Sequence, residues 1–191
     1  MNSKKQVILI TDGDASAKAA VKYVADKNGY EFIGESGGNP TRIAGDELIN
    51  IIKTSQKEPV LVLFDDCGYP DEGPGEKALI TIVNSPEVEV IGAVAVASQS
   101  FSHEWTRVDV SIDRNGVLTE YGVDKDGIKD TEVGRIIGDT VSILDRLPIP
   151  LIVGIGDIGK MGGQDSIEKG APITEKAVEL ILERSGNIGT S

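Results

Sequence analysis

Short runs of aliphatic and β-branched residues, separated by segments with helical spacing, constrain the fold of this chain more than any other feature. Three of the runs, at 7–10, 60–64 and 151–153, contain no polar residue. A strand that is apolar at every position must be buried on both faces, as in a parallel sheet covered by helices. Less uniform runs at 30–34 and 88–97 complete the alternation. The pattern predicts an α/β fold with a doubly wound, mostly parallel five-stranded sheet.

The pattern changes in the second half of the chain. Apolar and polar residues alternate over 108–112, and turn sequences follow at 113–116 and 124–127. Alternation with a period of two and an Asn-Gly turn are typical of an antiparallel hairpin. We therefore expect residues 1–191 to form a single three-layer domain of the flavodoxin or Rossmann kind, with a β-hairpin insertion at 107–128.

Charge and composition exclude several classes of function. The chain has 31 Asp and Glu residues against 19 Lys and Arg, which gives a formal net charge of −12. Such a negative surface repels nucleic-acid backbones, so we expect no nucleic-acid partner. The single cysteine cannot form an internal disulfide, and no apolar stretch approaches the roughly 18 residues of a membrane-spanning helix. We therefore expect a soluble protein, made in the cytoplasm, with no transmembrane segment of its own.

Four aspartates follow two of the predicted strands. Asp12 and Asp14 come after the first strand, and Asp65 and Asp66 come after the third. Ligands of doubly wound sheets bind at the carboxyl ends of the strands, where these acids would gather. Clustered carboxylates repel unless a proton, a hydrogen-bond donor or a cation relieves them, so Asp12, Asp65 and Asp66 are candidate ligands for Mg²⁺ or Ca²⁺. The alternative is that the aspartates cap helices and turns.

A glycine-rich loop follows the last predicted strand. Gly154, Gly156 and Gly159 match the pattern G-x-G-x-x-G, and Lys160 comes next. Such loops can present backbone N–H groups to phosphates. Asp157 within the loop opposes an anion, however, and no further strand follows to complete a βαβ unit. These residues are candidate ligand-binding positions, and the alternative is a surface loop or a partner contact.

The acids and Lys160 together resemble the phosphorylation site of bacterial receiver domains. There, acids follow the first strand, a phosphorylated aspartate follows the third and a lysine follows the fifth. Asp12 and Asp14, then Asp65 or Asp66, then Lys160 would take those places here. The fit is partial, because Lys160 lies several residues beyond its strand and the hairpin insertion is foreign to that pattern. An Mg-dependent phosphate- or nucleotide-handling domain is therefore an alternative function.

One short segment gathers three ring-bearing side chains, in a chain with only 4% aromatic residues: Phe101, His103 and Trp105. The single histidine excludes a His-rich zinc site. Aromatic side chains are enriched at the centres of protein interfaces. We therefore expect Phe101, His103 and Trp105 to contact a partner or to cover a sheet edge.

Several ordered motifs are similar to those of one protein family. They lie at residues 10–14 (ITDGD), 64–66 (FDD), 72–76 (EGPGE), 107–113 (RVDVSID), 120–127 (EYGVDKDG), 153–161 (VGIGDIGKM) and 181–186 (ILERSG). Each motif alone is short, but the ordered set covers nearly the whole chain. On this set the chain resembles the soluble stage V sporulation protein AE (SpoVAE) family of endospore-forming bacteria.

The resemblance implies a role in sporulation and spore germination. The family belongs with a group that includes membrane proteins and moves dipicolinic acid and its calcium salt across the spore inner membrane. The implied function is that of a non-catalytic accessory protein, peripheral on that membrane and partnered by other stage V sporulation membrane and soluble subunits. The resemblance supplies no catalytic residues. Calcium dipicolinate is a further candidate ligand, and self-association into a homo-oligomer stays open.

Overall fold

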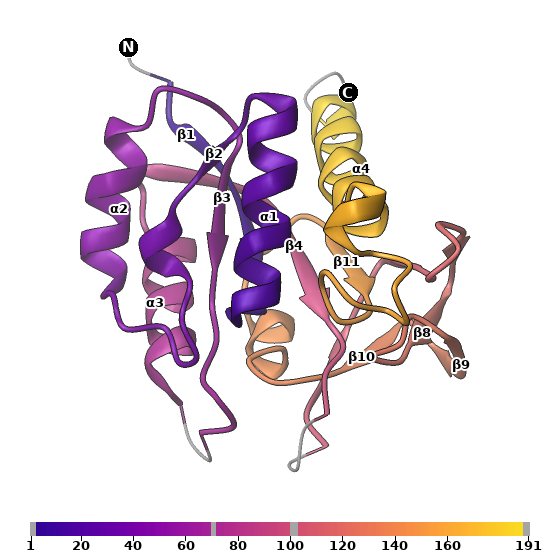
Figure 1. Ribbon diagram of the computed structural model, residues 1–191. Helices are drawn as coiled ribbons and strands as arrows, with labels where there is room; N and C mark the ends of the chain where they lie inside the picture. Colours follow the sequence, from indigo (N-terminus) through magenta and orange to yellow (C-terminus); the bar gives the residue numbers. More distant parts are fainter. Residues whose placement is uncertain (1–2, 70–71, 100–102, 189–191) are drawn as a thin grey trace.

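The computed structural model describes residues 3–69, 72–99 and 103–188. A seven-stranded sheet forms its centre, with the strand order β2-β3-β1-β4-β11-β6-β7 (Figure 1). Every neighbouring pair in this sheet is parallel except β6 and β7. In chain order the strands are β1 (Lys5–Ile10), β2 (Glu31–Phe32), β3 (Val60–Leu63), β4 (Val88–Val96), β6 (Val110–Ile112), β7 (Leu118–Thr119) and β11 (Ile152–Ile155).

Helices cover both faces of the sheet, which explains why the last four residues of β1, at 7–10, are all apolar. Ile8 and Ile10 pack with α1 and α4 on one face, whereas Val7 and Leu9 pack with α2 and α3 on the other. Alternate side chains of a strand point to opposite faces, so a strand between two helical layers needs consecutive apolar residues. Among the described residues, no helix has the length and apolar character needed to cross a membrane. The helices are α1 (Ala15–Asn28), α2 (Gly45–Thr54), α3 (Pro74–Val83), α4 (Pro172–Ile188) and the short 3-10 helices η1 (Gly34–Ser36), η2 (Ser142–Arg146) and η3 (Ile167–Lys169).

The predicted α/β architecture with a mostly parallel sheet is confirmed, but its size and strand order differ from expectation. The sheet has seven strands rather than five, because the insertion adds β6 and β7 beside β11. In the flavodoxin and Rossmann orders the first two strands are neighbours, whereas here β3 lies between β1 and β2. The two-residue strand β2 therefore lies at the sheet edge, and β1 is enclosed between β3 and β4.

The antiparallel segment is longer than predicted. Its first turn, at 113–116, joins β6 to β7, and its second turn joins β8 to β9. Beyond them, β10 returns to pair with β5, so antiparallel pairing extends over 105–137 rather than 107–128. The added strands are β5 (Trp105–Arg107), β8 (Tyr121–Val123), β9 (Lys129–Val133) and β10 (Arg135–Ile137). Part of this segment also joins the central sheet, because β6 pairs in parallel with β11.

Four strands of the sheet interior, β1, β3, β4 and β11, run in the same direction, so the loops that follow them leave from the same edge. Hydrogen bonds extend the pairing past the strand ends: Thr11 N–H donates to the Val94 carbonyl at 3.1 Å, and Phe64 N–H donates to the Ile10 carbonyl at 2.9 Å. The loops after β1, β3 and β4 are thereby held close together where they emerge. This edge carries the candidate site.

Candidate functional site

A cavity of about 670 Å³ opens at the carboxyl edge of the sheet. Its lining is strongly acidic, because it includes the aspartates Asp12, Asp14, Asp65, Asp139 and Asp157. The other lining residues are Thr11, Asn39, Cys67, Gly68, Tyr69, Val96, Ser98 and Gln99. Parallel strands that end at one edge thus bring together acids that are far apart in the sequence.

Asp12 and Asp14 are positioned by the sharp turn between β1 and α1. Asp14 is the N-cap of α1, and its Oδ1 accepts a hydrogen bond from Ala17 N–H at 2.8 Å, which satisfies a first-turn amide. Asp12 Oδ1 accepts bonds from Gly13 N–H at 2.7 Å and from Asp14 N–H at 3.3 Å. A Cβ at Gly13 would lie 2.3 Å from the Gly38 carbonyl oxygen, so only glycine fits this turn. The turn holds both carboxylates at the cavity.

The carboxylate of Asp12 is in an unusual environment. Burial, followed by the charges of Asp14 and Asp157, raises the pKa of Asp12 to about 7. Its second oxygen, Oδ2, is inaccessible to solvent and has no hydrogen-bond partner among the described residues. A buried polar atom without a partner costs free energy. Asp12 Oδ2 is therefore an acceptor that the surrounding chain leaves unused.

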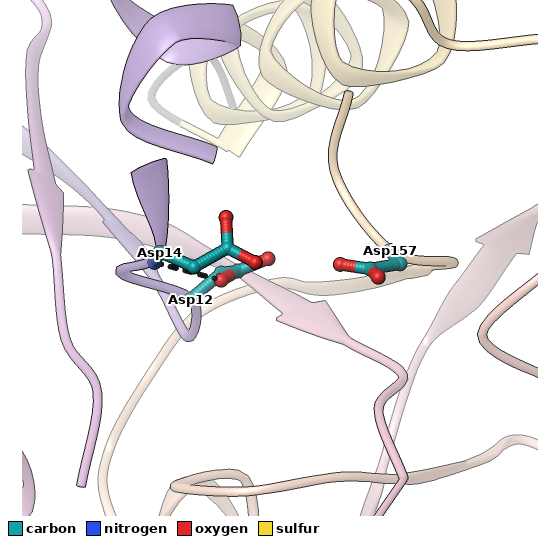
Figure 2. Close-up of side chains that lie close together, drawn as sticks. All are labelled: Asp12, Asp14 and Asp157. Atoms are coloured by element: carbon teal, nitrogen blue, oxygen red, sulfur yellow. Dashed lines mark hydrogen bonds between the residues drawn. The ribbon is translucent and has the colours of Figure 1, made fainter. Parts of the chain in front are cut away.

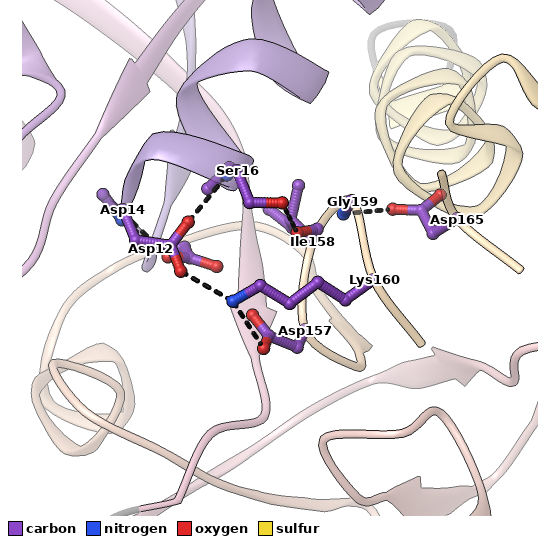
Figure 3. Close-up of polar contacts among 10 residues, drawn as sticks. Asp12, Asp14, Ser16, Asp157, Ile158, Gly159, Lys160 and Asp165 are labelled. Atoms are coloured by element: carbon purple, nitrogen blue, oxygen red, sulfur yellow. Dashed lines mark hydrogen bonds and ion pairs between the residues drawn. The ribbon is translucent and has the colours of Figure 1, made fainter. Parts of the chain in front are cut away.

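Lys160 joins the loops that follow β1 and β11 (Figure 3). Its Nζ donates to Asp14 Oδ2 at 2.8 Å and to Asp157 Oδ2 at 3.0 Å. Burial alone would lower the pKa of Lys160, but these two hydrogen bonds outweigh it and raise the pKa. Burial likewise opposes ionisation of Asp14, yet the bond from Lys160 lowers the pKa of that carboxyl. The lysine is thus a charged group held between two carboxylates.

Asp65 and Asp66 are adjacent in the sequence but serve different parts of the structure. Asp65 lines the cavity, its Oδ1 accepts a hydrogen bond from Cys67 N–H at 2.7 Å, and burial raises its pKa to about 6. Asp66 instead accepts bonds from Gly75 N–H at 2.6 Å and Glu76 N–H at 3.1 Å, in the first turn of α3. Asp65 therefore lines the cavity, whereas the Asp66 carboxylate is directed at the start of α3.

The structure therefore places the residues predicted as metal ligands in a different grouping from the one expected. Asp12 lies with Asp14 and Asp157, whose carboxylate oxygens come within 4.8 Å of one another and of Asp12 (Figure 2). Asp66 caps a helix instead of joining this group. In the described part of the chain, Lys160 makes no hydrogen bond to the acids after β3, so the arrangement differs from that expected for a receiver domain.

Packing, rather than a phosphate site, accounts for Gly154 in β11 and for the glycines of the loop that follows it. A Cβ at Gly154 would lie 2.6 Å from Ile136 Cγ1, and a Cβ at Gly156 would lie 2.6 Å from the Gly127 nitrogen. Gly159 has a φ of +77°, in the left-handed region that favours glycine. These glycines allow neighbouring segments to approach the loop closely.

Asp165 satisfies the N–H groups that a phosphate would otherwise bind. Its Oδ2 accepts a hydrogen bond from Gly159 N–H at 2.9 Å, and its Oδ1 accepts bonds from Ile173 N–H and Thr174 N–H at the start of α4. The Thr174 hydroxyl also donates to Oδ2 at 2.6 Å. Because this carboxylate is fully buried, it fills the anion position at the helix N-terminus from within the chain.

Comparison with protein-family models identifies the relatives of this chain. The model of stage V sporulation protein AE1 matches residues 6–185 of the 191. The chain belongs to the SpoVAE family. No curated protein and no solved structure matches it. The match confirms the resemblance carried by the ordered motifs, and it makes this a protein of stage V of sporulation.

The aromatic segment of this SpoVAE chain is described only in part. Phe101 lies outside the described residues. His103 is exposed and has a φ of 50°. Trp105, in β5, is 41% exposed. The guanidinium carbon of Arg135 lies 4.2 Å from the centre of the Trp105 ring. A partner contact at this segment stays a prediction.

Asp139 is a cavity residue that sequence reasoning missed. It follows β10, and its Oδ2 accepts a hydrogen bond from Gly68 N–H at 2.6 Å, which ties the loops after β10 and β3 together. A signal was present in the sequence, because Asp139 follows a short apolar run as Asp12 does. The run at 135–137 contains an arginine and only two apolar residues, so it does not stand out as a strand of the core.

A substitution of Asp165 tests whether its carboxylate holds the glycine-rich loop against the start of α4. We expect Asp165→Ala to lower the free energy of unfolding by about 3 kcal/mol or more, because it leaves several buried donors without an acceptor. Urea denaturation followed by circular dichroism measures the change. Asp126→Ala is the matched control, because Asp126 is exposed in a turn. Equal stability of the two variants would contradict the role assigned to Asp165.

Glu76, in α3, is a second acid that sequence reasoning missed. It is half-buried, and burial, followed by the charges of Asp66 and Glu104, raises its pKa from 4.5 to about 7. Between these two pH values the folded protein keeps a proton that the unfolded chain releases. Stability therefore falls as pH rises through this window and is fully retained only below it.

We accordingly expect Glu76→Gln to melt at a higher temperature than the wild type at pH 8, by a few degrees, and at a similar temperature at pH 4. Thermal melts across this pH range measure the difference. Glu47→Gln, at an exposed position of α2, is the control and should follow the wild type at every pH. A difference in melting temperature between Glu76→Gln and the wild type that stays the same at every pH would show that the Glu76 carboxyl does not titrate in this window.

Proposed function

We propose that this protein is a non-catalytic accessory component of sporulation and spore germination, acting beside the membrane machinery that moves dipicolinic acid and its calcium salt across the spore inner membrane. Its membership of the SpoVAE family supports a role in stage V of sporulation. In this proposal the protein is peripheral on the spore inner membrane, and it is held there by contacts with other stage V sporulation subunits.

The observation that carries this proposal is the apolar surface of the antiparallel segment. Six of the eight large hydrophobic side chains that the described residues expose lie between 105 and 137. Large exposed apolar side chains in one part of a protein favour a contact with another protein there. The six residues are Trp105, Val117, Leu118, Ile128, Val133 and Ile137.

We name Trp105, Arg135 and Ile137 the ribbon surface. Trp105 and Ile137 are paired directly opposite each other in β5 and β10, so their side chains lie on one face of this two-stranded sheet. They are 41% and 46% exposed, and Arg135 packs over the indole ring. Trp and Arg are enriched among the residues that contribute most to binding. The proposal assigns this surface to a membrane subunit of the stage V machinery that presents apolar side chains.

The double variant Trp105→Ala/Ile137→Ala tests the docking proposal. We expect it to fold and to lose at least tenfold of its association with the stage V membrane subunits, because the apolar anchors are removed. Co-purification from detergent-solubilised spore membranes, with immunoblots for those subunits, measures the association. Tyr23→Ala removes an exposed aromatic from α1 and is the control. Unchanged co-purification of the double variant, or no association of the wild type, would refute the proposal.

A second candidate function, direct binding of calcium dipicolinate, is favoured by the acidic lining of the cavity. Free dipicolinate is a dianion, which the aspartates would repel. The calcium chelate presents a cation whose shell of about 6–8 ligands is only partly filled by dipicolinate. In this proposal Asp65 and Asp139, which both line the cavity, complete that shell. A cavity of about 670 Å³ is large enough for a ligand with a single ring.

Calorimetry tests the second candidate. We expect heat of binding when premixed Ca²⁺ and dipicolinate are titrated into the protein, and none when a stronger calcium chelator is present. The double variant Asp65→Asn/Asp139→Asn should bind at least tenfold more weakly, because two ligand carboxylates are lost. The ribbon variant Trp105→Ala/Ile137→Ala should bind as the wild type does. Equal heat with and without calcium would contradict this candidate.

A further inference from the structure

We propose that Asp12, Asp14 and Asp157 form a binding site for a hard divalent cation, Mg²⁺ or Ca²⁺, and that the Lys160 ammonium occupies the site when the cation is absent. Neither the family match nor the docking proposal implies such a site. The inference rests on three features of the molecule: the spacing of the carboxylates, an unused oxygen of Asp12 and the contacts of Lys160.

The spacing of the three carboxylates suits one ion. One oxygen from each lies within 4.8 Å of the others, and Figure 2 shows the Asp157 carboxylate facing those of Asp12 and Asp14. Opposite ligands of a cation are separated by twice the bond length, about 4.6–5.2 Å for Ca²⁺ and about 4.2 Å for Mg²⁺. Oxygens at this spacing need little or no movement to share an ion. Oxygen-only ligands are those that Mg²⁺ and Ca²⁺ prefer.

The unused oxygen of Asp12 points to a missing ligand. Asp12 Oδ1 already accepts two backbone N–H groups, whereas the buried Oδ2 has no partner in the described part of the chain. A cation would satisfy Oδ2 and would offset the mutual repulsion of the three carboxylates.

Lys160 behaves as a replaceable counter-ion. Its Nζ bonds Asp14 and Asp157 at 2.8 and 3.0 Å (Figure 3), so it relieves two of the carboxylates and not the third. Its side chain is 48% exposed, which leaves a path into solvent when an ion arrives. The open cavity beside the cluster supplies the water ligands that a Mg²⁺ or Ca²⁺ ion keeps when few protein groups bind it.

Titration calorimetry with CaCl₂ and with MgCl₂, in excess KCl to suppress nonspecific binding, tests the site. We expect one ion per wild-type chain and binding at least tenfold weaker for Asp12→Asn, which keeps the Oδ1 acceptor and so the local turn. Lys160→Gln should bind several-fold more tightly, because it removes the competing ammonium. Asp126→Asn, an exposed acid in a turn, is the matched control and should bind as the wild type does.

The two variants shift affinity in opposite directions, so loss of folding cannot mimic the result. Saturable binding of either ion with this pattern supports the site, and the tighter ion identifies its size preference. Binding that is equal in Asp12→Asn and the wild type would assign the ion to another acidic surface and would overturn the proposal. An absence of binding to both the wild type and Lys160→Gln would overturn it as well.

Discussion

Parallel pairing of β1 with β3 on one side and β4 on the other is the constraint on which the site depends. It places the turn after β1 between the loops that follow its neighbours, and backbone hydrogen bonds from Thr11 and Phe64 hold those loops together past the strand ends. The carboxylates are thus gathered by the backbone of the sheet and not by their own attraction. Their mutual repulsion is a cost that burial of the apolar strands offsets.

Aspartates in this fold divide into those that support the structure and those that remain available. Asp66 and Asp165 direct their carboxylates at the first-turn amides of α3 and α4, where a negative group is favourable. Asp14 does both, because Oδ1 caps α1 while Oδ2 faces Lys160. Asp12 alone among these acids keeps a buried oxygen without a partner. A carboxylate oxygen without a hydrogen-bond partner, rather than negative charge alone, therefore distinguishes a candidate metal ligand from a helix cap.

The sequence was sufficient to predict features that depend on local pattern. The apolar runs specified β1, β2, β3, β4 and β11, and the Asn-Gly turn specified the hairpin, but no pattern indicated that β6 also pairs in parallel with β11. The sequence could not predict that β3 lies between β1 and β2. Strand order depends on the path of the helical connections between strands, which the apolar runs do not encode. Asp65 and Asp66 could not be distinguished either, since one residue of register decides which carboxylate faces the cavity. The partners of Lys160 depend on the path of a loop, and no periodic pattern encodes that path.

The ribbon surface and the acidic cavity meet at one short segment. Ser98 N–H donates to the Ile137 carbonyl at 3.1 Å, and Asp139 N–H donates to the Ser98 hydroxyl at 2.9 Å. Ser98 and Asp139 line the cavity, while Ile137 is exposed on the ribbon. A partner that displaced this segment would therefore alter the cavity wall and the affinity for a ligand there. By thermodynamic linkage, a ligand in the cavity would change the affinity for the partner by the same coupling free energy. The two proposed roles, docking and ligand binding, thus share a backbone connection and need not be independent.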